Sequence, residues 1–272
     1  MSQRTRVGVV QMTSQADVAV NLDTAERLVR RAAEDGAQLV VLPECFAYLG
    51  PDEGFRDVAE PLPGNGPVLT RCSRMARECG AELVVGGFWE RVGDERRVRN
   101  ACVHFGADGA LVSIYRKIHL FDVDLPGGPR LVESDNVQPG TDVVVTQTRF
   151  GALGLSVCYD LRFPELYRRL VDGGAIALAV PAAFTLTTGK DHWHVLLRAR
   201  AIESQAYVLA AAQTGWHFGK RVSYGHALIV DPWGVVLAEC GEGEGAAVAW
   251  VEPDVVERVR NTVPSLRHRR LT

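Results

Sequence analysis

The amino-acid sequence predicts an α/β fold whose strands run both parallel and antiparallel to their neighbours. Short apolar runs alternate with segments of helical periodicity, which is the pattern of βα units and parallel strands. Two other segments each hold two strand-like runs around a turn, which predicts antiparallel hairpins. No long Ser-, Pro- or Gly-rich linker divides the chain, so we expect residues 1–272 to form a single domain.

The βα units follow one another along the chain. The first comprises the strand "RVGVVQM", a helix over residues 21–34 with apolar residues at helical spacing, and the strand "AQLVVLPE". The second places the strand "AELVVGGFWE" after a helix over 69–79, and the third places "AIALAVPAAF" after a helix over 164–171. Strands of this kind are expected to lie parallel within a sheet.

The predicted hairpins are "RNACVHFGADGALVSIYRK" and "SYGHALIVDPWGVVLAEC", whose turns are Ala-Asp-Gly and Asp-Pro-Trp-Gly. Between them lies the longest stretch without a clear pattern, residues 119–139. Loops of that length in compact domains are usually functional or disordered. The polar residues on either side of this stretch favour a functional loop.

Charge and hydropathy exclude several classes of protein. There are 30 Lys and Arg residues against 33 Asp and Glu residues, giving a formal net charge of −3, so we expect no nucleic-acid partner. The dense basic run "RHRR", residues 267–270, is interpreted as a solvated tail or surface contact. The N-terminal apolar run is too short for a secretory signal, and no segment reaches the roughly 18 apolar residues of a membrane span. We therefore expect a cytoplasmic protein with no membrane partner.

The six cysteines lie far apart and include no C-x-x-C pair. This spacing suggests neither a zinc site nor a disulfide framework. We expect free thiols, one of which could have a special role.

Three polar residues follow apolar strand patterns: Glu44 in "QLVVLPECF", Lys117 in "ALVSIYRKIHLFD" and Cys158 in "ALGLSVCYD". The carboxyl ends of strands are where α/β sheets build their sites. Taken singly, each residue has an ordinary interpretation, as a capping carboxylate, a solvated lysine or a buried packing thiol. Taken together, they make a coherent catalytic set.

In this set Cys158 is the nucleophile of an acyl-transfer reaction. The sequence places Cys158 near a helix N-terminus, where backbone N–H groups lower a thiol's pKa. A carboxylate at Glu44, with a pKa raised by burial, would take the thiol proton and return it to a leaving amine. Lys117 and the backbone N–H of Tyr159 would stabilise the oxyanion.

Other catalytic arrangements remain open at this point. His119, His192 and His194 could supply a Cys-His enzyme of the papain type, although each could equally be a packing or hydrogen-bonding residue. Ser156 lies in "GLSVC", which lacks the last glycine of a G-x-S-x-G elbow. The "GEGEG" run at 241–245 precedes a strand pattern where a phosphate loop needs a helix, so we interpret it as a turn.

Arginines offer candidate anchors for a substrate carboxylate, because the guanidinium fork matches that group. The candidates are Arg162, Arg198 and Arg200. The alternative is that they pair with nearby carboxylates of the chain, namely Asp160, Glu165 and Glu203.

The segments "LPECF", "YRKIHLFD" and "GLSVCYDLRFPELYR" are similar, in order and spacing, to the catalytic segments of the nitrilase superfamily of carbon–nitrogen hydrolases. The resemblance covers nearly the whole chain. It implies a four-layer αββα sandwich of two mixed sheets and a catalytic triad of Glu44, Lys117 and Cys158. It also implies a second active-site glutamate at Glu133, in "LVESDNVQPG", no metal or organic cofactor, and a homodimer or higher homo-oligomer formed through the outer helices.

Within the superfamily, "CYDLRFPEL", "HWHVLLRARAIESQAYVLAAAQTG" and "SYGHALIVDPWG" are most similar to deaminated glutathione amidases, whereas "AFTLTTG" is closer to the omega-amidases. The resemblance implies hydrolysis of a small carboxylated amide through a thioester, with deaminated glutathione as the first candidate. The alternatives are 2-oxoglutaramate, a nitrile, an N-carbamoyl amine, or a catalytically silent binding protein. We expect Arg162, Phe184, Thr185 and His192 to contact the substrate.

Overall fold

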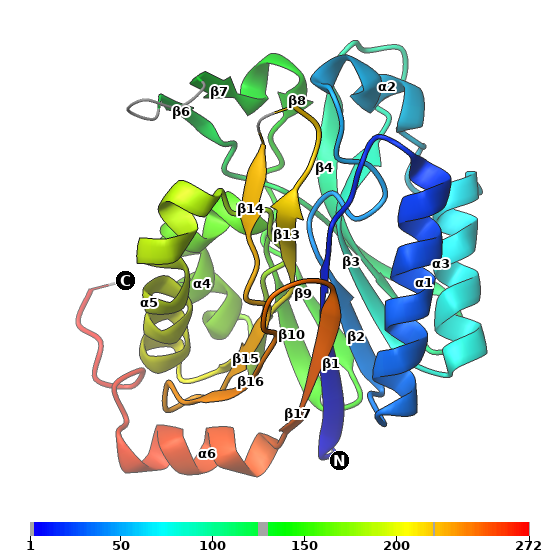
Figure 1. The fold of residues 1–272 in the computed structure, drawn as a ribbon. Helices are drawn as coiled ribbons and strands as arrows, with labels where there is room; N and C mark the ends of the chain where they lie inside the picture. The colour runs from blue at the N-terminus through cyan, green and yellow to red at the C-terminus, as the bar shows by residue number, and fades with distance from the viewer. Residues whose placement is uncertain (1–2, 125–129, 220, 272) are drawn as a thin grey trace.

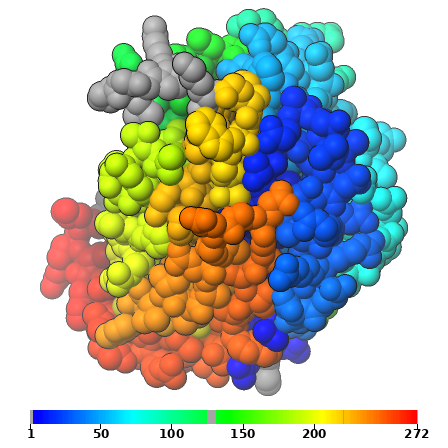
Figure 2. Space-filling view, viewed as in Figure 1, coloured from blue at the N-terminus to red at the C-terminus, as the bar shows by residue number. Residues whose placement is uncertain are grey.

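The structure, a computed structural model, describes residues 3–124, 130–219 and 221–271. Two mixed β-sheets pack face to face, and helices cover the outer side of each sheet (Figure 1). This arrangement confirms the predicted four-layer αββα sandwich. The space-filling view shows the blue N-terminal part of the chain lying against the orange segment, whereas the red C-terminal end lies at the left edge (Figure 2).

The first sheet has the strand order β14-β13-β1-β2-β3-β4-β5, with β17 also paired to β1 and β8 to β4. Its strands are β1 (Thr5–Met12), β2 (Leu39–Leu42), β3 (Glu82–Glu90), β4 (Val98–Phe105), β5 (Leu111–Arg116), β8 (Val137–Gln138), β13 (Ala212–Trp216), β14 (Val222–Tyr224) and β17 (Gly245–Val251). Strands β1, β2 and β3 are parallel, and β3, β4 and β5 are antiparallel. The first predicted hairpin is therefore β4–β5.

The second sheet has the order β16-β15-β12-β11-β10-β9. Its strands are β9 (Val145–Thr148), β10 (Gly151–Leu155), β11 (Ala177–Ala179), β12 (Tyr207–Ala210), β15 (Leu228–Val230) and β16 (Val236–Glu239). The central strands β10, β11 and β12 are parallel, and β15–β16 is the second predicted hairpin. The mixture of parallel and antiparallel neighbours agrees with the sequence prediction in both sheets.

Helices α1 and α3 pack on the first sheet, and α4 and α5 pack on the second (Figure 1). The helices are α1 (Val18–Glu34), α2 (Phe55–Val58), α3 (Pro67–Cys79), α4 (Pro164–Asp172), α5 (Leu186–Ser204) and α6 (Pro253–Thr262), with the 3-10 turns η1 (Asp52–Gly54), η2 (Glu133–Asp135) and η3 (Cys158–Arg162). None of the helices in the described ranges is long and apolar enough to cross a membrane.

The alternation of side chains along β1 explains the layering. Val7 and Val9 are buried between the two sheets, whereas Val10 and Met12 point the other way and pack beneath α1. Every strand residue from Val7 to Met12 is therefore buried, on one face or the other. This explains why the strand reads as a continuous apolar run rather than an alternating one.

Two helices begin earlier than their apolar periodicity predicted. Helix α1 begins at Val18 rather than residue 21, because the carboxylate of Asp17 accepts hydrogen bonds from the N–H groups of its first turn. Helix α3 begins at Pro67 rather than residue 69, because the buried Glu60 carboxylate accepts from the N–H groups of Val68 and Leu69. In both cases the polar cap precedes the first core residue.

The stretch 119–139 contains more regular structure than the sequence indicated. It forms the two-stranded ribbon β6 (Asp122–Asp124) and β7 (Arg130–Val132), then η2 and β8. Residues 125–129 of this stretch lie outside the described residues. The ribbon lies at the top of the molecule in the view of Figure 1, at the same end as β8 and α2.

Candidate active site

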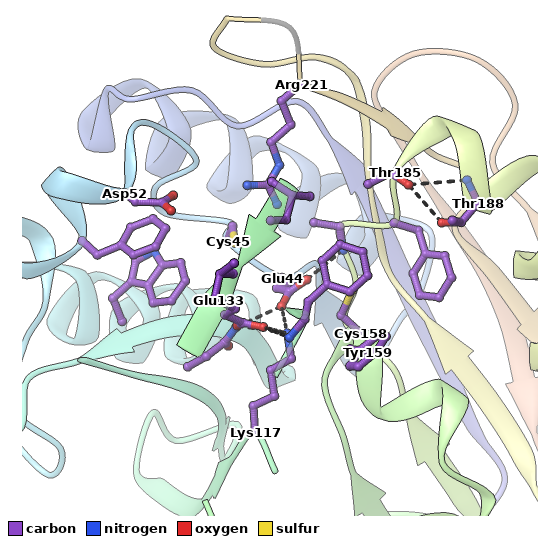
Figure 3. A pocket seen from close by; sticks show the side chains of 18 of the residues that line it. Glu44, Cys45, Asp52, Lys117, Glu133, Cys158, Tyr159, Thr185, Thr188 and Arg221 are labelled. Atoms are coloured by element: carbon purple, nitrogen blue, oxygen red, sulfur yellow. Dashed lines mark hydrogen bonds and ion pairs between the residues drawn. The ribbon is translucent and has the colours of Figure 1, made fainter. Parts of the chain in front are cut away.

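Glu44 and Lys117 follow two non-adjacent strands of the first sheet and meet in a buried ion pair. Glu44 lies just after β2, Lys117 directly follows β5, and Lys117 Nζ is 3.0 Å from Glu44 Oε1 (Figure 3). Glu44 and Lys117 are 4% and 2% exposed. The other oxygen of Glu44 accepts from the backbone N–H of Ala183, at 3.0 Å. The carboxylate is thus fixed at both oxygens.

Glu133 holds the ammonium of Lys117 from the opposite side. Its two carboxylate oxygens lie 3.1 and 2.8 Å from Lys117 Nζ, and it also accepts from the N–H of Phe121. Asn100, on β4, donates through Nδ2 to both Glu44 and Glu133. Glu133 thus lies in the same cluster as Glu44 and Lys117, and Asn100 joins the two carboxylates.

Cys158 comes from the second sheet, in the turn that follows β10. It is the first residue of η3, and its φ of 49° lies in the left-handed region that non-glycine residues rarely occupy. Its backbone N–H donates to the carbonyl of Pro181, at 2.9 Å. The neighbouring N–H of Tyr159 has no acceptor among the described residues, so it is available to a substrate oxygen.

A fully buried carboxylate, Asp160, braces this turn against the first sheet. It accepts from the Val157 N–H within the turn, from the hydroxyl of Tyr115 on β5, and from both the backbone and the ring of His119. Asp160 thus links the strand that ends at Lys117 to the turn that carries Cys158. His119 is held in this role, with its ring stacked 3.6 Å from that of Phe163.

Two adjacent glycines of β3 allow the close packing behind the site. A Cβ atom on Gly87 would lie 2.0 Å from the backbone nitrogen of Cys45 and 2.8 Å from the carbonyl carbon of Glu44. A Cβ atom on Gly86 would lie 2.0 Å from the side chain of Pro181, whose carbonyl receives the Cys158 N–H. Real Cβ atoms do not approach so closely, so the "GG" of "VVGGFWE" is required by the site's geometry.

The pKa of Glu44 shifts in the direction opposite to the one that the sequence suggested, whereas Lys117 carries the positive charge that was expected. Burial raises the pKa of Glu44, but the Lys117 ammonium and hydrogen bonds from Cys158, Lys117 and Asn100 outweigh it, so the pKa is lowered. The expectation of a raised carboxyl pKa was therefore wrong. Burial lowers the pKa of Lys117, but Glu133 and Glu44 raise it well above its usual value.

The expectation that a helix N-terminus would lower the pKa of the Cys158 thiol was also wrong. Burial and then the negative charge of Glu44 raise the pKa of Cys158 well above its usual value, despite the opposing charge of Lys117. The resting site thus holds a carboxylate, an ammonium and a neutral thiol. The proton therefore rests on the thiol and not on the neighbouring carboxylate.

Glu44, Lys117, Glu133 and Cys158 line one cavity of about 120 Å³ (Figure 3). Of the residues expected to contact a substrate, Arg162, Phe184 and Thr185 line it, as does Tyr159. His192 does not line it. Instead, its ring nitrogen lies 3.3 Å from the guanidinium of Arg162.

Several lining residues were missed by sequence reasoning. These are Cys45, Asp52, Phe55, Trp89, Asn100, Phe121, Leu131, Val132, Ala183, Thr188 and Arg221. Of these residues, only Asn100 could have been noticed in the sequence, because it is a polar residue inside the apolar strand "RNACVHF". The others come from segments that only the tertiary fold brings together.

The alternative catalytic residues lie elsewhere. His119 and His194 do not line the cavity, and His194 is bound to Glu239 at 2.8 Å. Ser156 is fully buried and hydrogen-bonded to the carbonyl of Ala179. Neither the papain-type nor the serine arrangement is therefore assembled among the described residues.

Two of the three candidate arginine anchors serve the fold. Arg200 pairs with Glu203 at 2.7 Å, as the alternative interpretation proposed, and Arg198 donates to the carbonyl of Gly234. Arg162 lies over the ring of Phe184 and faces the cavity. It is the candidate that the fold directs toward the site.

Comparison with known proteins agrees with this geometry. Residues 6–261 match the carbon–nitrogen hydrolase family. The chain is 45% identical over 269 residues to the deaminated glutathione amidase of Bos taurus, which covers 97% of this chain and 81% of that protein. The chain therefore belongs to the carbon–nitrogen hydrolase family and is an amidase of the nitrilase superfamily.

Solved structures of similar proteins share the fold. The crystal structure of the Caenorhabditis elegans NitFhit protein matches with a TM-score of 0.92 and 40% identity, covering 99% of this chain and 66% of that one. A mutant of the Nesterenkonia sp. AN1 amidase matches with a TM-score of 0.77 and 27% identity, over 96% and 98% of the two chains. That structure contains the product of acrylamide addition at its active-site cysteine.

Proposed function

We propose that this protein hydrolyses the amide bond of deaminated glutathione, releasing 2-oxoglutarate and cysteinylglycine. The observation that carries the proposal is the buried cluster of Glu44, Lys117 and Cys158 around one cavity. The identity to deaminated glutathione amidase over nearly the whole chain supports the choice of substrate. We assign catalytic roles to these three residues and to Glu133, and an oxyanion-binding role to the N–H of Tyr159.

In the first half of the reaction, Glu44 removes the proton of Cys158 as the sulfur attacks the amide carbonyl carbon. The negative charge that develops on the carbonyl oxygen is stabilised by Lys117 and by the N–H of Tyr159. The carbon–nitrogen bond then breaks, and the amine leaves with the proton that Glu44 had accepted. A thioester joins the 2-oxoglutaryl group to Cys158.

In the second half, Glu44 takes a proton from water, and the resulting hydroxide adds to the thioester carbonyl. The same donors stabilise the second oxyanion. The carbon–sulfur bond breaks, the sulfur regains a proton from Glu44, and 2-oxoglutarate leaves. Glu133 and Asn100 do not exchange protons in this scheme. They hold Lys117 charged and hold Glu44 in position.

The substrate's acyl half carries a carboxylate, and we assign its binding to Arg162. This arginine belongs to η3, the same turn as Cys158, and lies 5.2 Å above the centre of the Phe184 ring. A guanidinium held in this way is suited to a carboxylate. Phe184 and Thr185 complete the acyl site, whereas His192 acts by contacting Arg162 from outside.

We also propose that residues 1–272 form one domain and that the domain pairs into at least a homodimer through its outer helices. Helix α5 supports this, because it exposes Val195 and Ile202, at 67% and 50%. Ile202 lies against the turn of the β15–β16 hairpin, where Trp233 and Val235 are also exposed. A contiguous apolar surface of this kind is typical of an interface.

The experiment that tests the proposed function measures 2-oxoglutarate released from deaminated glutathione and from 2-oxoglutaramate, with the Cys158→Ala variant as control. We expect kcat/KM to be higher for deaminated glutathione. A preference for 2-oxoglutaramate would make the protein an omega-amidase. Failure on both substrates, with Cys158 still reactive toward acrylamide, would direct the search to nitriles and N-carbamoyl amines. Failure on both with an unreactive Cys158 would favour a catalytically silent binding protein.

A further inference from the structure

The cavity contains a second arginine, Arg221, that the catalytic mechanism does not use. Elsewhere in the chain, arginines commonly pair with carboxylates, as Arg116 does with Glu90 and Arg71 with Glu26. Within the described ranges, neither Arg162 nor Arg221 has a carboxylate oxygen within 4.0 Å. Two guanidinium groups thus face one cavity, and neither forms a salt bridge with a carboxylate of the described residues.

The fold holds the backbone of Arg221 in a defined turn between β13 and β14. The carbonyl of Arg221 accepts from the N–H of His217 at 2.9 Å, and its own N–H donates to the carbonyl of Phe218. His217 is in turn fixed by hydrogen bonds to the Ser14 carbonyl and to Ser223, each at 2.8 Å. From this turn the side chain of Arg221 points toward the cluster of Glu44 and Glu133 (Figure 3).

The two arginines that line the cavity come from different segments of the chain. Arg162 lies in the same five-residue turn as Cys158, so it is suited to the short acyl half that stays bound to the sulfur. Arg221 comes from a hairpin turn, and it shares its end of the cavity with the exposed side chain of Asp52. The open end of a site is where a leaving group departs.

Deaminated glutathione has a carboxylate at each end and the reacting amide between them. One carboxylate belongs to the 2-oxo acid of the acyl half, and the other belongs to the glycine of the leaving half. A single guanidinium cannot bind both. By contrast, 2-oxoglutaramate has only the acyl carboxylate, because its leaving group is ammonia.

We propose that Arg221 is a specificity-determining residue that binds the glycine carboxylate of the leaving cysteinylglycine, while Arg162 binds the acyl carboxylate. This inference rests on the proposed function and extends it to the recognition of the leaving group. A charge-assisted hydrogen bond of this kind discriminates strongly between ligands that have the carboxylate and ligands that lack it. Arg221 therefore distinguishes a dipeptide leaving group from ammonia.

Asp52 allows a second test, in which a substitution is expected to strengthen substrate binding. Its carboxylate lies at the same end of the cavity and repels a substrate carboxylate bound at Arg221. Replacing it by the neutral and nearly isosteric asparagine removes that repulsion. The Asp52→Asn variant should therefore bind deaminated glutathione more tightly, with little change for 2-oxoglutaramate.

The experiment compares wild type with Arg221→Ala on three substrates: deaminated glutathione, the same molecule with its glycine carboxylate amidated, and 2-oxoglutaramate. For Arg221→Ala we expect kcat/KM on deaminated glutathione to fall about tenfold or more, mainly through KM. The fall on the amidated substrate and on 2-oxoglutaramate should be at most about twofold. Arg221→Lys should restore part of the loss, and the exposed Arg97→Ala should change nothing.

Each other outcome overturns the inference. Equal losses on all three substrates would show that Arg221 supports the fold or the acyl half, and no loss on deaminated glutathione would show that it does not bind the leaving group. If wild type hydrolyses deaminated glutathione but does not distinguish it from the amidated form, this inference fails and the proposed function stands. If wild type does not hydrolyse deaminated glutathione, both fail.

Discussion

At the scale of single residues, the site depends on how its buried charges balance one another. Lys117 lies between the carboxylates of Glu44 and Glu133, and its raised pKa keeps it an ammonium. The same ammonium keeps Glu44 ionised against the effect of burial. Removing either partner would leave a buried charge uncompensated, which is costly. Each charge of the cluster therefore depends on the presence of the others, and Lys117 keeps Glu44 in the ionised form that the proposed mechanism requires.

The lowered pKa of Glu44 predicts an unusual pH profile. Because the carboxylate is the active form, activity is present above its pKa and lost as the pH falls through it. We expect the acid limb of kcat/KM to lie below the ordinary glutamate value of about 4.3. The raised pKa of Lys117 predicts no loss of its charge before about pH 10.4. The measurement is kcat/KM on 2-oxoglutaramate against pH, since this substrate carries no thiol.

Circular dichroism at each pH separates loss of activity from loss of fold. An acid limb near about 6.5, the ordinary histidine value, would contradict this account of Glu44. Such a result would return attention to a histidine as the base.

At the scale of elements, tight backbone contacts decide where the catalytic side chains lie. Gly87 approaches the backbone of Glu44 and Cys45, and Gly86 approaches Pro181, whose carbonyl holds the Cys158 turn. The β-bulge of β3 thus lies against the backbone that carries Glu44 and against Pro181, which binds the Cys158 turn. A side chain at either glycine would have to displace one of them.

We predict that Gly87→Ala lowers kcat at least about tenfold, because a misplacement of about 1 Å at a catalytic group can cost a hundredfold. Gly80 is the matched control, since it also has a positive φ but a Cβ atom there meets nothing within 4 Å. Gly80→Ala should lose about 1–2 kcal/mol of stability from the left-handed backbone conformation, and Gly87→Ala should lose more, because its Cβ atom also meets the backbone of Cys45. Only Gly87→Ala should lose activity, as measured by kcat beside thermal unfolding. Equal activity in the two variants would contradict this role of Gly87.

The sequence predicted the type of the elements whose apolar periodicity is strong, and it made no prediction for helices α5 and α6. It missed the starts of α1 and α3, because Asp17 and Glu60 act before the periodic residues begin. It also missed the ribbon β6–β7, whose short strands carry few apolar residues. An apolar pattern in the sequence thus predicts that a helix or strand is present, but it does not predict the polar contacts that fix where the element begins.

At the scale of the whole molecule, the site exists only where the two sheets meet. Glu44 and Lys117 follow strands of the first sheet, and Cys158 follows a strand of the second. The packing of apolar side chains between the sheets therefore sets the distance between base and nucleophile. Asp160 reinforces that distance through its hydrogen bond from Tyr115.

The candidate triad could be found in the sequence because each member ends an apolar run. The lining residues Asp52 and Arg221 could not, because one lies in the short 3-10 turn η1 and the other lies between β13 and β14, far apart in the chain. The charges of Glu44 and Cys158 were also beyond the sequence, since they depend on which neighbours are buried beside them. The sequence thus predicted which residues form the candidate triad, but it did not predict their pKa shifts, which depend on the packing around them.

The proposed homodimer is tested on helix α5. We predict that wild type elutes as a dimer or larger assembly and that Val195→Glu together with Ile202→Glu weakens the assembly, because two carboxylates would be buried at an apolar interface. Val20→Glu is the control, since Val20 is 54% exposed on α1, which covers the other sheet. Light scattering after gel filtration gives the mass. A monomeric wild type, or dissociation by Val20→Glu alone, would contradict an interface on α5.

The central claim, that Cys158 is the nucleophile, is tested most directly by comparing two cysteines of the same cavity. Cys45 is also buried, also has a positive φ, and lies beside Glu44. Each is replaced by alanine, folding is checked by circular dichroism, and kcat is measured on deaminated glutathione and 2-oxoglutaramate. We predict that Cys158→Ala has no turnover above background, while Cys45→Ala keeps most of the wild-type activity. Turnover by a folded Cys158→Ala variant near the wild-type rate would contradict the account.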